Sequence, residues 1–393
     1  MFVRKRPIFP HELRQSEFDV ITAPRNGRSI VVHDARMAMD MRHMRMSHNT
    51  FDFDAVFGEK VDSGAVYDGA VAPLVASALR GGYTTAMMYG QTGSGKTYTM
   101  SSIYRLSSQA VFASLPAGAK VYVSFVEVIG EKCNDMLSFG GQVRLMTGRD
   151  GSVRPTPLVD VRAEDADALS AYIDYACALR ATAATGVHDA SSRSHAVCSI
   201  RIESGRGEAQ RTGVLNLVDL AGSEHNIDSK DHDARRRKEG AKINASLMAL
   251  KECVHAVASS HQSGRPHAHM AYRKSKLTYL LKNCFTAADA LSVIIATVSP
   301  SSKDTEHSLN TLRHACVMDG KRNESGETRF ITGGRVETED VGEVDITAIA
   351  RARRKTEREG GTVRDFKGKP TRTKLPTHGN IGASRPLTPR KEA

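Results

Sequence analysis

The 393-residue sequence lacks three features that would place it outside the cytoplasm. No apolar run approaches the roughly 18 residues that a membrane-spanning helix needs. The first ten residues, MFVRKRPIFP, carry charges where a secretory signal would need its apolar stretch. The six cysteines are widely spaced and form no CxxC pair, which argues against a disulfide framework or a structural zinc site. We therefore expect a cytoplasmic protein with reduced thiols.

The charge of the chain leans positive, with 55 Lys and Arg against 44 Asp and Glu and a net charge of +11. Such an excess points to an acidic partner: nucleic acid, anionic lipid or an acidic protein surface. The excess is densest after residue 320, where Gly, Thr, Arg, Lys and Pro dominate. We expect a folded domain over residues 1–320 and a basic, largely disordered tail over residues 321–393. The tail is consistent with a solvated linker or with an electrostatic tether for an acidic partner, and ITAIARARRK favours one short helix within residues 344–357.

Two kinds of apolar segment alternate from the start of the chain to about residue 317. Continuous apolar runs are typical of strands buried on both faces, whereas apolar residues at helical spacing predict helices. We expect strands at residues 29–33, 84–89, 120–128, 195–203, 213–219 and 291–298, and helices at residues 69–79, 165–179 and 240–257. This alternation predicts an α/β fold, with a central sheet covered by helices on both sides.

The segment GQTGSGKT, residues 90–97, matches the phosphate-binding P-loop pattern GxxxxGK[ST] and directly follows the apolar run TTAMMY. Its glycines let backbone N–H groups curl around phosphate oxygens at the positive end of the next helix. Lys96 is placed to reach the β- and γ-phosphates, and Thr97 to bind Mg²⁺. The predicted nucleotide cradle comprises Gly90, Gln91, Thr92, Gly93, Ser94, Gly95, Lys96 and Thr97.

Two further loops carry residues suited to a nucleotide-hydrolysing site. In LVDLAGSE, residues 217–224, Asp219 ends an apolar strand and a DxxG turn follows. Such an aspartate holds the Mg²⁺ shell, and the amide of Gly222 senses the γ-phosphate. The polar loop SSRSH, residues 191–195, offers hydroxyls that bind Mg²⁺ and orient water. Arg193 and Glu224 carry opposite charges on the two loops, so we expect a salt bridge that closes both over the γ-phosphate.

In their order and spacing, GQTGSGKTYTM, SSRSH and LVDLAGSE resemble the motor domain of the kinesin superfamily. The resemblance covers roughly residues 2–318 and includes VRKRP, FVEVIGEKCNDML, YRKSKLT and LNTLR. It implies the P-loop NTPase kinesin motor fold, with a central, mostly parallel β-sheet sandwiched by helices. It also implies a microtubule-stimulated ATPase of the cytoskeleton that uses ATP and Mg²⁺ and binds tubulin.

The resemblance assigns roles to individual residues of the nucleotide site. It implies that the adenine is flanked by Arg4, Pro7 and Tyr98. It implies that Mg²⁺ is held by Thr97, Ser192 and Asp219, and that Ser191 positions the attacking water. The catalytic loops would contribute Ser191, Ser192, Arg193, Gly222 and Glu224. The guanine-reading pattern NKxD is absent from the sequence, which favours ATP over GTP. One departure is His188, where kinesins usually have Asn, and it implies slower or pH-dependent loop closure.

Within the superfamily, the sequence most resembles the kinesin-13 group, whose internal motors depolymerise microtubules. Three features carry this resemblance: the first Lys of VRKRP, the triplet KEC at residues 251–253, and the insert VHDARMAMDMRHMRM at residues 32–46. The insert resembles the finger loop with which the group presses on tubulin. The group's Lys-Val-Asp fingertip aligns with Ala38, Met39 and Asp40, so its lysine is lost, and His255 stands where the group tends to have Arg. The resemblance implies a depolymerase acting at microtubule ends, weakened by these changes.

Helical geometry predicts which side of residues 240–257 meets a partner. Steps of 100° place Glu252 opposite the stripe of apolar residues and Lys251 on its flank. Microtubule surfaces are acidic, so basic residues near this side are candidate contacts. The candidate microtubule contacts are Arg36, Asp40, Arg42, Lys251, Glu252, Cys253, His255, Arg273 and Lys276.

Two other activities stay open beside depolymerisation. A translocating motor is disfavoured because CVMDGK, residues 316–321, poorly resembles a docking linker and no coiled-coil heptads follow. A microtubule anchor with an impaired ATPase is favoured by His188 and the altered fingertip. We expect neither a specific nucleic-acid partner nor a membrane. The sequence leaves open whether spindle, cytoplasmic or axonemal microtubules are the target.

Overall fold

The computed structural model describes residues 1–40, 42–182, 192–205, 210–224, 234–263, 272–287, 289–319 and 334–343. Ser191, His188 and the short helix expected within residues 344–357 lie outside the described residues. The chain divides into two compact units, one of Met1–Asp34 with Ser47–Glu337 and one of Ala35–Met46 with Thr338–Ala393. Among the described residues, no helix combines the length and the apolar character that a membrane crossing requires.

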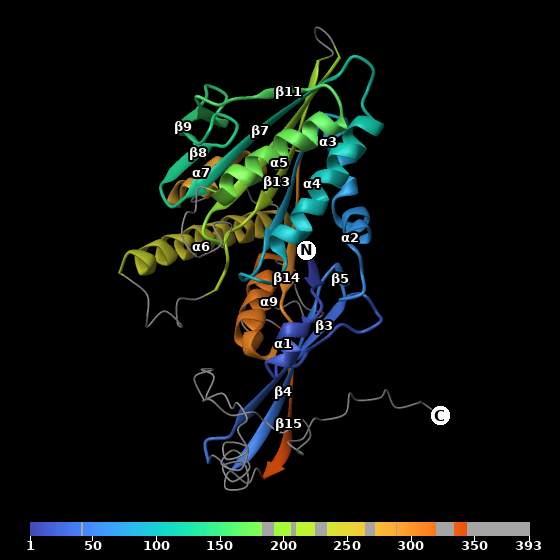
Figure 1. Ribbon diagram of the computed structural model, residues 1–393, viewed down its shortest axis with the longest axis vertical. Coiled ribbons are helices and arrows are strands. Elements are labelled where there is room, and N and C mark those ends of the chain that lie inside the picture. Colours follow the sequence, from blue (N-terminus) through green and yellow to red (C-terminus); the bar gives the residue numbers. More distant parts are fainter. Residues whose placement is uncertain are drawn as a thin grey trace. The chain divides into compact units, whose positions relative to one another are not determined.

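A sheet of 11 strands forms the centre of the larger unit (Figure 1). Its order is β10-β9-β8-β7-β12-β13-β6-β14-β1-β5, with β11 paired to β7. The strands are β1 (Phe2–Lys5), β5 (Ala55–Phe57), β6 (Tyr83–Tyr89), β7 (Lys120–Ile129), β8 (Lys132–Asp135), β9 (Gly141–Thr147), β10 (Val153–Thr156), β11 (Val161–Ala163), β12 (His195–Ser204), β13 (Arg211–Asp219) and β14 (Ala290–Val298). Most run in the direction of β6, which has parallel neighbours on both sides. The predicted α/β class with a mostly parallel central sheet is confirmed.

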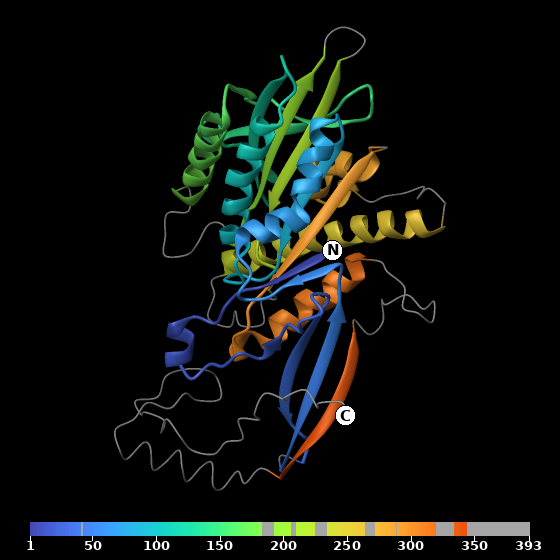
Figure 2. The same cartoon turned by 90° about the vertical axis from the view of Figure 1, so that its right-hand side faces the viewer.

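Helices cover both faces of this sheet (Figure 2). The helices that pack against one face are α2 (Ser63–Ala70), α3 (Ala72–Leu79), α4 (Lys96–Ala113) and α5 (Ala166–Thr182). Those against the other face are α6 (Ala234–Ser263), α7 (Lys276–Leu280), α8 (Lys282–Thr286) and α9 (Thr305–Asp319). Each face has its own apolar core, with Leu74 and Ile103 in the first and Leu247 and Leu309 in the second. The predicted helix at residues 69–79 is wrong in its start, because Pro73 in the first turn of α3 cannot continue the hydrogen bonding of α2.

A second sheet has the strand order β15-β4-β3-β2. Its strands are β2 (Ile21–Thr22), β3 (Ser29–Met37), β4 (His43–Asp52) and β15 (Arg335–Glu343). The predicted strand at residues 29–33 therefore continues to Met37 and enters the expected finger. β15 corrects the expectation of disorder for part of the tail, since Val336, Thr338 and Val341 favour an extended backbone and β4 supplies its partner.

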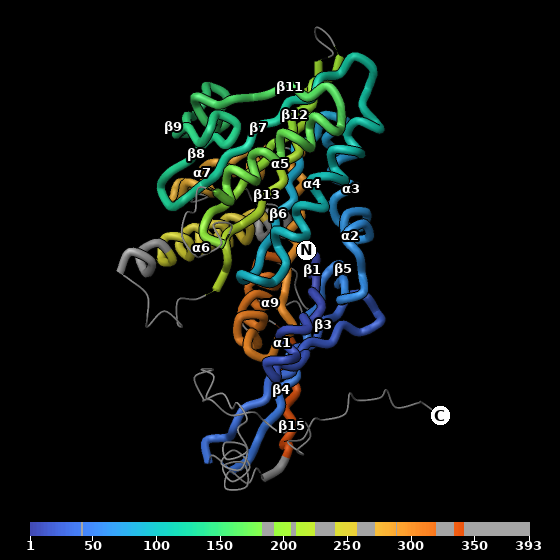
Figure 3. Tube along the Cα trace, in the orientation of Figure 1, coloured from blue at the N-terminus to red at the C-terminus, as the bar shows by residue number. Residues whose placement is uncertain are grey.

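The parallel part of the main sheet brings the candidate loops together. The chain passes from β6 through the P-loop directly into α4, as the trace in Figure 3 shows. β13 runs parallel to β6 and pairs Asp219 with Met88, so both strands end at the same edge of the sheet. Ligands of open α/β sheets bind at the carboxyl ends of the strands. The fold therefore places Asp219 beside the P-loop.

Candidate functional site

The P-loop forms a tight turn that only glycine permits at its first position. A Cβ on Gly90 would lie 2.3 Å from the carbonyl oxygen of Thr297. Inside the turn, the carbonyl oxygen of Gln91 accepts hydrogen bonds from Lys96 Nζ at 2.9 Å and from Ser94 Oγ at 2.7 Å. The turn ends at the N-terminus of α4, where free amides and the helix dipole attract a phosphate.

Oxygen ligands suited to Mg²⁺ meet next to this turn. Thr97 Oγ1 donates a hydrogen bond to Asp219 Oδ2 at 3.0 Å. The other carboxylate oxygen, Asp219 Oδ1, is buried without a hydrogen-bond partner among the described residues. Hydroxyl and carboxylate oxygens are ligands that Mg²⁺ prefers, and a buried acceptor that lacks a donor fits a cation or its water shell. Among the described residues, no cluster of three or more His, Cys, Asp or Glu forms another metal site.

Arg180 is a site residue that the sequence interpretation missed. It is buried on α5, and its Nη1 donates to Asp219 Oδ2 at 2.9 Å. Its Nε and Nη2 donate to the hydroxyl and the carbonyl oxygen of Ser194, in the SSRSH loop. The guanidinium thus ties the Asp219 carboxylate, a candidate Mg²⁺ ligand, to this loop. A signal was present, because Arg180 continues the apolar stripe of Leu169, Ile173 and Ala176 on the same helix.

The loop after β13 contacts both the SSRSH loop and the P-loop. The amide of Gly222 donates to the carbonyl oxygen of Ser192 at 2.9 Å. The carboxylate of Glu224 accepts hydrogen bonds from the amide of Thr92 at 2.9 Å and from its hydroxyl at 2.5 Å. The expected pair between Arg193 and Glu224 is not formed among the described residues, because Glu224 lies against the P-loop threonine instead. The structure therefore joins the two loops through backbone hydrogen bonding.

His195, the last residue of SSRSH, connects three elements beneath these loops. Its Nδ1 accepts a hydrogen bond from the amide of Ala221 at 3.1 Å, and its Nε2 lies 2.8 Å from Ser246 Oγ on α6. Ser246 Oγ donates to the carbonyl oxygen of Ile243, so Nε2 is the donor toward Ser246. Burial is the main cause that lowers the pKa of His195 to about 3. A proton on Nδ1 would face the Ala221 amide, so the ring is held neutral.

Because this ring stays neutral in the folded protein, the free energy of unfolding depends on pH. The ordinary pKa of 6.5 lies above the folded value of about 3, so the unfolded chain binds the proton first as pH falls. The contribution of His195 to the free energy of unfolding is complete above pH 6.5. It declines below that pH and is smaller by about 2 kcal/mol at pH 5. Urea unfolding between pH 7 and pH 5 measures this loss. His195→Gln is expected to be less stable at pH 7 but to show a shallower decline, and an unchanged slope would contradict the assignment.

The side of the P-loop that should bind adenine presents two flat groups. The guanidinium carbon of Arg4 lies 5.6 Å from the centre of the exposed Tyr98 ring. Arg4 Nη1 also donates to Thr99 Oγ1 at 2.8 Å and to Ser63 Oγ at 3.0 Å, which fixes its plane. Pro7 is exposed nearby in sequence, after the end of β1. Flat faces of this kind fit the stacking of a base.

A family model for the kinesin motor domain matches residues 4–319. The chain belongs to the kinesin motor-domain family. Kinesin motor domains are microtubule-stimulated ATPases that bind ATP or ADP with Mg²⁺. The predicted superfamily and motor fold are therefore confirmed.

Curated relatives differ in subgroup. "Diatom spindle kinesin-1" of Cylindrotheca fusiformis is 38% identical over 331 residues, "Kinesin-like protein KIF24" of Homo sapiens 38% over 327, and "Kinesin-like protein KIN-13B" of Arabidopsis thaliana 36% over 323. These alignments cover 83%, 80% and 80% of this chain but 51%, 23% and 46% of the relatives, so the chain spans about half of their length or less. The solved C-terminal motor and motor homology domain of Kar3Vik1, fused to a synthetic heterodimeric coiled coil, matches with a TM-score of 0.68 and 27% identity over 82% of this chain and 84% of that chain.

The KEC triplet of this kinesin lies on α6, and its three side chains point in different directions. Glu252 faces solvent, as the helical geometry predicts, and its carboxylate pairs with Lys274 Nζ at 2.6 Å. Cys253 is only 1% exposed and packs in the core, three residues after Leu250 on the apolar stripe. Its assignment as a microtubule contact is therefore wrong. Lys251 Nζ lies 5.7 Å from the centre of the Tyr89 ring, and burial lowers its pKa to about 8.

The other candidates on this side are more accessible. His255 on α6 is partly exposed, Arg273 is exposed in a short 3-10 turn before α7, and Lys276 begins α7 half-buried. The guanidinium carbon of Arg273 lies 5.9 Å from the Tyr279 ring centre, which holds it near α7. Nothing in these contacts prevents Arg273 or Lys276 from meeting an acidic surface.

The fingertip is a tight turn organised by Asp40. Asp40 Oδ1 accepts hydrogen bonds from the amides of Arg42 and His43, and Oδ2 lies 2.5 Å from His43 Nδ1. These hydrogen bonds, with the Arg42 amide as the largest cause, lower the pKa of the exposed Asp40 carboxyl. Met39 is fully exposed at the tip, and Arg36 and Arg42 are exposed beside it in sequence. Asp40 thus shapes the turn between Arg36 and Arg42.

Proposed function

We propose that this kinesin motor domain hydrolyses ATP and uses the cycle to depolymerise microtubules from their ends, in the manner of the kinesin-13 group. The observation that carries the proposal is the long β3–β4 hairpin with its exposed methionine and arginines. The KEC triplet on α6 and the 36% identity to "Kinesin-like protein KIN-13B" support the same subgroup. The motor would bend terminal tubulin instead of walking along the lattice.

The nucleotide chemistry follows from the P-loop and its neighbours. The P-loop amides and Lys96 would hold the phosphates of ATP, while Thr97, Asp219 and Ser192 would hold Mg²⁺. The cation supplies charge neutralisation at the β- and γ-phosphates when bound. Gly222 would place its amide against the γ-phosphate, and Ser191 would orient the attacking water. Closure of the two loops over the γ-phosphate is the step that excludes bulk water.

The Glu224 carboxylate would serve as the switch of this cycle. It accepts two hydrogen bonds from Thr92 in the P-loop. Arrival of a γ-phosphate near the P-loop would repel this carboxylate, because like charges at short range are unfavourable. Glu224 would then exchange Thr92 for Arg193, the partner expected from the sequence. Phosphate release would reverse the exchange.

Two alternative activities differ in the results that they predict. A microtubule anchor with weak turnover is favoured by His188 and by the loss of the fingertip lysine at Ala38, and it would bind microtubules without stimulated turnover and without shortening. A translocating motor is favoured by membership of the family alone, and directed gliding on a coated surface would reveal it. We place the chain in the cytoplasm on microtubules, and the spindle is the array to examine first because the diatom relative is named a spindle kinesin.

A lysine at the fingertip tests the role of the hairpin. Ala38 donates its amide to the carbonyl oxygen of His43, a hydrogen bond that lysine also makes, so Ala38→Lys leaves the turn intact. One added charge facing an acidic surface is worth about 0.2–1 kcal/mol, so we expect microtubules to shorten up to about fivefold faster at limiting protein. Ala117→Lys, which adds the same charge in the exposed turn after α4, is the matched control and should change nothing. Equal effects of the two variants on the rate of microtubule shortening would contradict the role assigned to the fingertip.

A further inference from the structure

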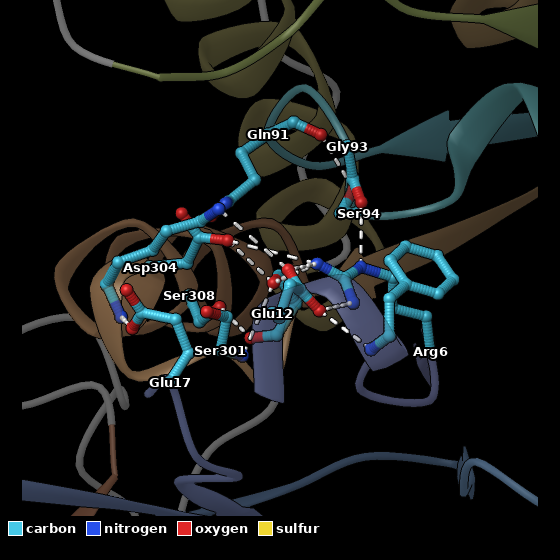
Figure 4. A network of polar contacts seen from close by, with 12 residues as sticks. Arg6, Glu12, Glu17, Gln91, Gly93, Ser94, Ser301, Asp304 and Ser308 are labelled. Carbon is cyan, nitrogen blue, oxygen red and sulfur yellow. Dashed lines mark hydrogen bonds and ion pairs between the residues drawn. The ribbon is translucent and has the colours of Figure 1, made fainter. Parts of the chain in front are cut away.

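A buried ion pair lies behind the P-loop, outside the groups assigned to the nucleotide. Arg6 follows β1, and Glu12 lies on the short helix α1 (Pro10–Arg14). Arg6 Nη1 and Nη2 donate to the two oxygens of Glu12 at 2.8 Å and 2.6 Å, a bidentate arrangement (Figure 4). Arg6 is 8% exposed and Glu12 2%. Hydrogen bonding from Arg6 is the main cause that lowers the pKa of Glu12 to about 2, so the pair is charged at any physiological pH.

The third edge of the Arg6 guanidinium reaches the P-loop itself. Its Nε donates to the carbonyl oxygen of Gly93 at 2.8 Å. On the other side of the same peptide, the amide of Ser94 donates to the carbonyl oxygen of Gln91. The peptide between Gly93 and Ser94 is therefore held at both of its polar atoms.

A fixed peptide at this point matters because Gly93 can rotate easily. Gly93 has φ 77, and no heavy atom lies within 4 Å of the place where a Cβ would be. Sterics alone therefore do not hold the peptide in one orientation. A flipped peptide would turn a carbonyl oxygen toward the cradle that must accept phosphate oxygens. Two partial negative charges would then oppose each other, so the orientation of this peptide affects nucleotide binding directly.

Besides Glu12, with which it forms the pair called the brace below, Arg6 contacts Ser299 and the Phe9 ring. Nη2 donates to Ser299 Oγ at 2.7 Å, and Ser299 Oγ donates to Asp304 Oδ2, also at 2.7 Å. The face of the guanidinium lies 4.3 Å from the centre of the Phe9 ring. Charges this deeply buried contribute little net stability compared with apolar residues of the same volume. Stability alone is therefore a weak reason for an arginine here, whereas a fixed donor aimed at Gly93 is something that an apolar side chain cannot supply.

We propose that Arg6, clamped by Glu12, is a positioning residue for nucleotide binding: it sets the orientation of the Gly93 peptide in the P-loop. Arg6 itself does not touch the nucleotide. The proposal rests on the ATP site described above and adds to it a residue that acts through the P-loop backbone. Removal of the brace lowers the affinity for ATP and ADP alike, because both place phosphates in the same cradle. It leaves the chemical step largely unchanged once the site is filled.

The test compares two variants of the brace with one variant of its surroundings. Arg6→Lys keeps the charge but replaces a planar fork by a single ammonium, which cannot hold Gly93, Glu12 and Ser299 in the same directions. Glu12→Asp keeps the opposite charge but shortens it by one methylene and breaks the bidentate geometry. Ser299→Ala removes one neutral hydrogen bond to Arg6 and leaves the Nε contact with Gly93 in place. Each is measured in the full chain for Mg-ADP dissociation constant, KM for ATP, kcat with microtubules, and urea unfolding.

For Arg6→Lys we expect KM and the Mg-ADP dissociation constant to rise at least tenfold, with kcat within threefold. Glu12→Asp should raise both at least threefold, and it carries the comparison if Arg6→Lys does not fold. Ser299→Ala should lower stability but keep KM within twofold. Unchanged KM in folded Arg6→Lys and Glu12→Asp would overturn the proposal, as would an equal rise in Ser299→Ala. If the unmodified chain bound no Mg-ADP, the proposed ATP site would fail instead, so the two failures are distinguishable.

Discussion

Gly222→Ala is expected to lower microtubule-stimulated ATP turnover about a hundredfold while the domain stays folded. A Cβ at this position would lie 2.2 Å from Glu224 Oε2 and 2.5 Å from Thr92 Oγ1. The nearest atoms are the ends of two side chains, so the methyl group displaces them without rebuilding the core. The amide that should meet the γ-phosphate is then shifted, and loss of one such positioned donor costs on the order of a hundredfold in rate.

The reduced turnover must be separated from general damage. Gly58→Ala is the matched control, because the nearest atom to its added Cβ is Ala23 Cβ at 3.6 Å, an ordinary contact. Single-turnover phosphate release should be slow in Gly222→Ala and normal in Gly58→Ala. Mg-ADP binding should be retained in both, since only the end of the Thr92 side chain moves and the P-loop backbone keeps its shape. Turnover within threefold of the unmodified chain in Gly222→Ala would contradict the role assigned to this loop.

Lys96→Ala is expected to weaken Mg-ATP binding and turnover together, with kcat/KM lower by at least a hundredfold. Lys96 is 6% exposed and lies within the P-loop turn, where its Nζ bonds to the carbonyl oxygen of Gln91. A charged donor held in a water-poor turn interacts with phosphate more strongly than it would in bulk water. Its removal therefore costs affinity in the ground state and stabilisation of the transition state.

The control for this loss is the same substitution at a lysine outside the site. Lys120→Ala removes an exposed lysine at the start of β7 and should leave kcat/KM unchanged. Calorimetric titration measures the dissociation constant of Mg-ADP, and steady-state phosphate release measures kcat/KM. Binding and turnover of Lys96→Ala within threefold of Lys120→Ala would show that the P-loop does not hold the phosphates as described.

The geometry of the candidate nucleotide site could be predicted because most of it is local. The P-loop is one contiguous segment, and its shape depends on glycines and backbone amides next to one another in sequence. The strands around it are continuous apolar runs, so β6, β13 and β14 were predicted near their observed bounds. Asp219 follows from the same logic, since a polar residue that ends a buried strand must lie at the edge of the sheet.

Contacts between segments far apart in the chain could not be predicted from the sequence. The Arg6–Glu12 pair reaches the P-loop across almost ninety positions of the chain, and no pattern within a segment reveals it. Opposite charge suggested Arg193 as the partner of Glu224, but in the fold Glu224 accepts hydrogen bonds from Thr92 of the P-loop. Arg180 occupies the next position of the apolar stripe of α5, but it was overlooked because only apolar residues were used to identify the stripe.

The helix that carries KEC shows the limit of an ideal helical wheel. The wheel placed Glu252 correctly toward solvent. It left Lys251 on the flank, where the side chain is half-buried and its Nζ lies 5.7 Å from the centre of the Tyr89 ring. Cys253 was assigned by family resemblance, although its spacing from Leu250 directs it inward. The strand β15 shows a different limit, because its acidic composition resembles disorder and its partner β4 is almost three hundred residues away.

The most direct measurement is the length of end-stabilised microtubules, imaged over time with the unmodified chain and ATP while phosphate release is recorded in the same sample. The proposal predicts shortening at both ends, phosphate release stimulated by tubulin, and neither effect when a non-hydrolysable ATP analogue replaces ATP. Constant microtubule length with stimulated phosphate release would contradict depolymerisation and leave a kinesin ATPase that binds microtubules without taking them apart.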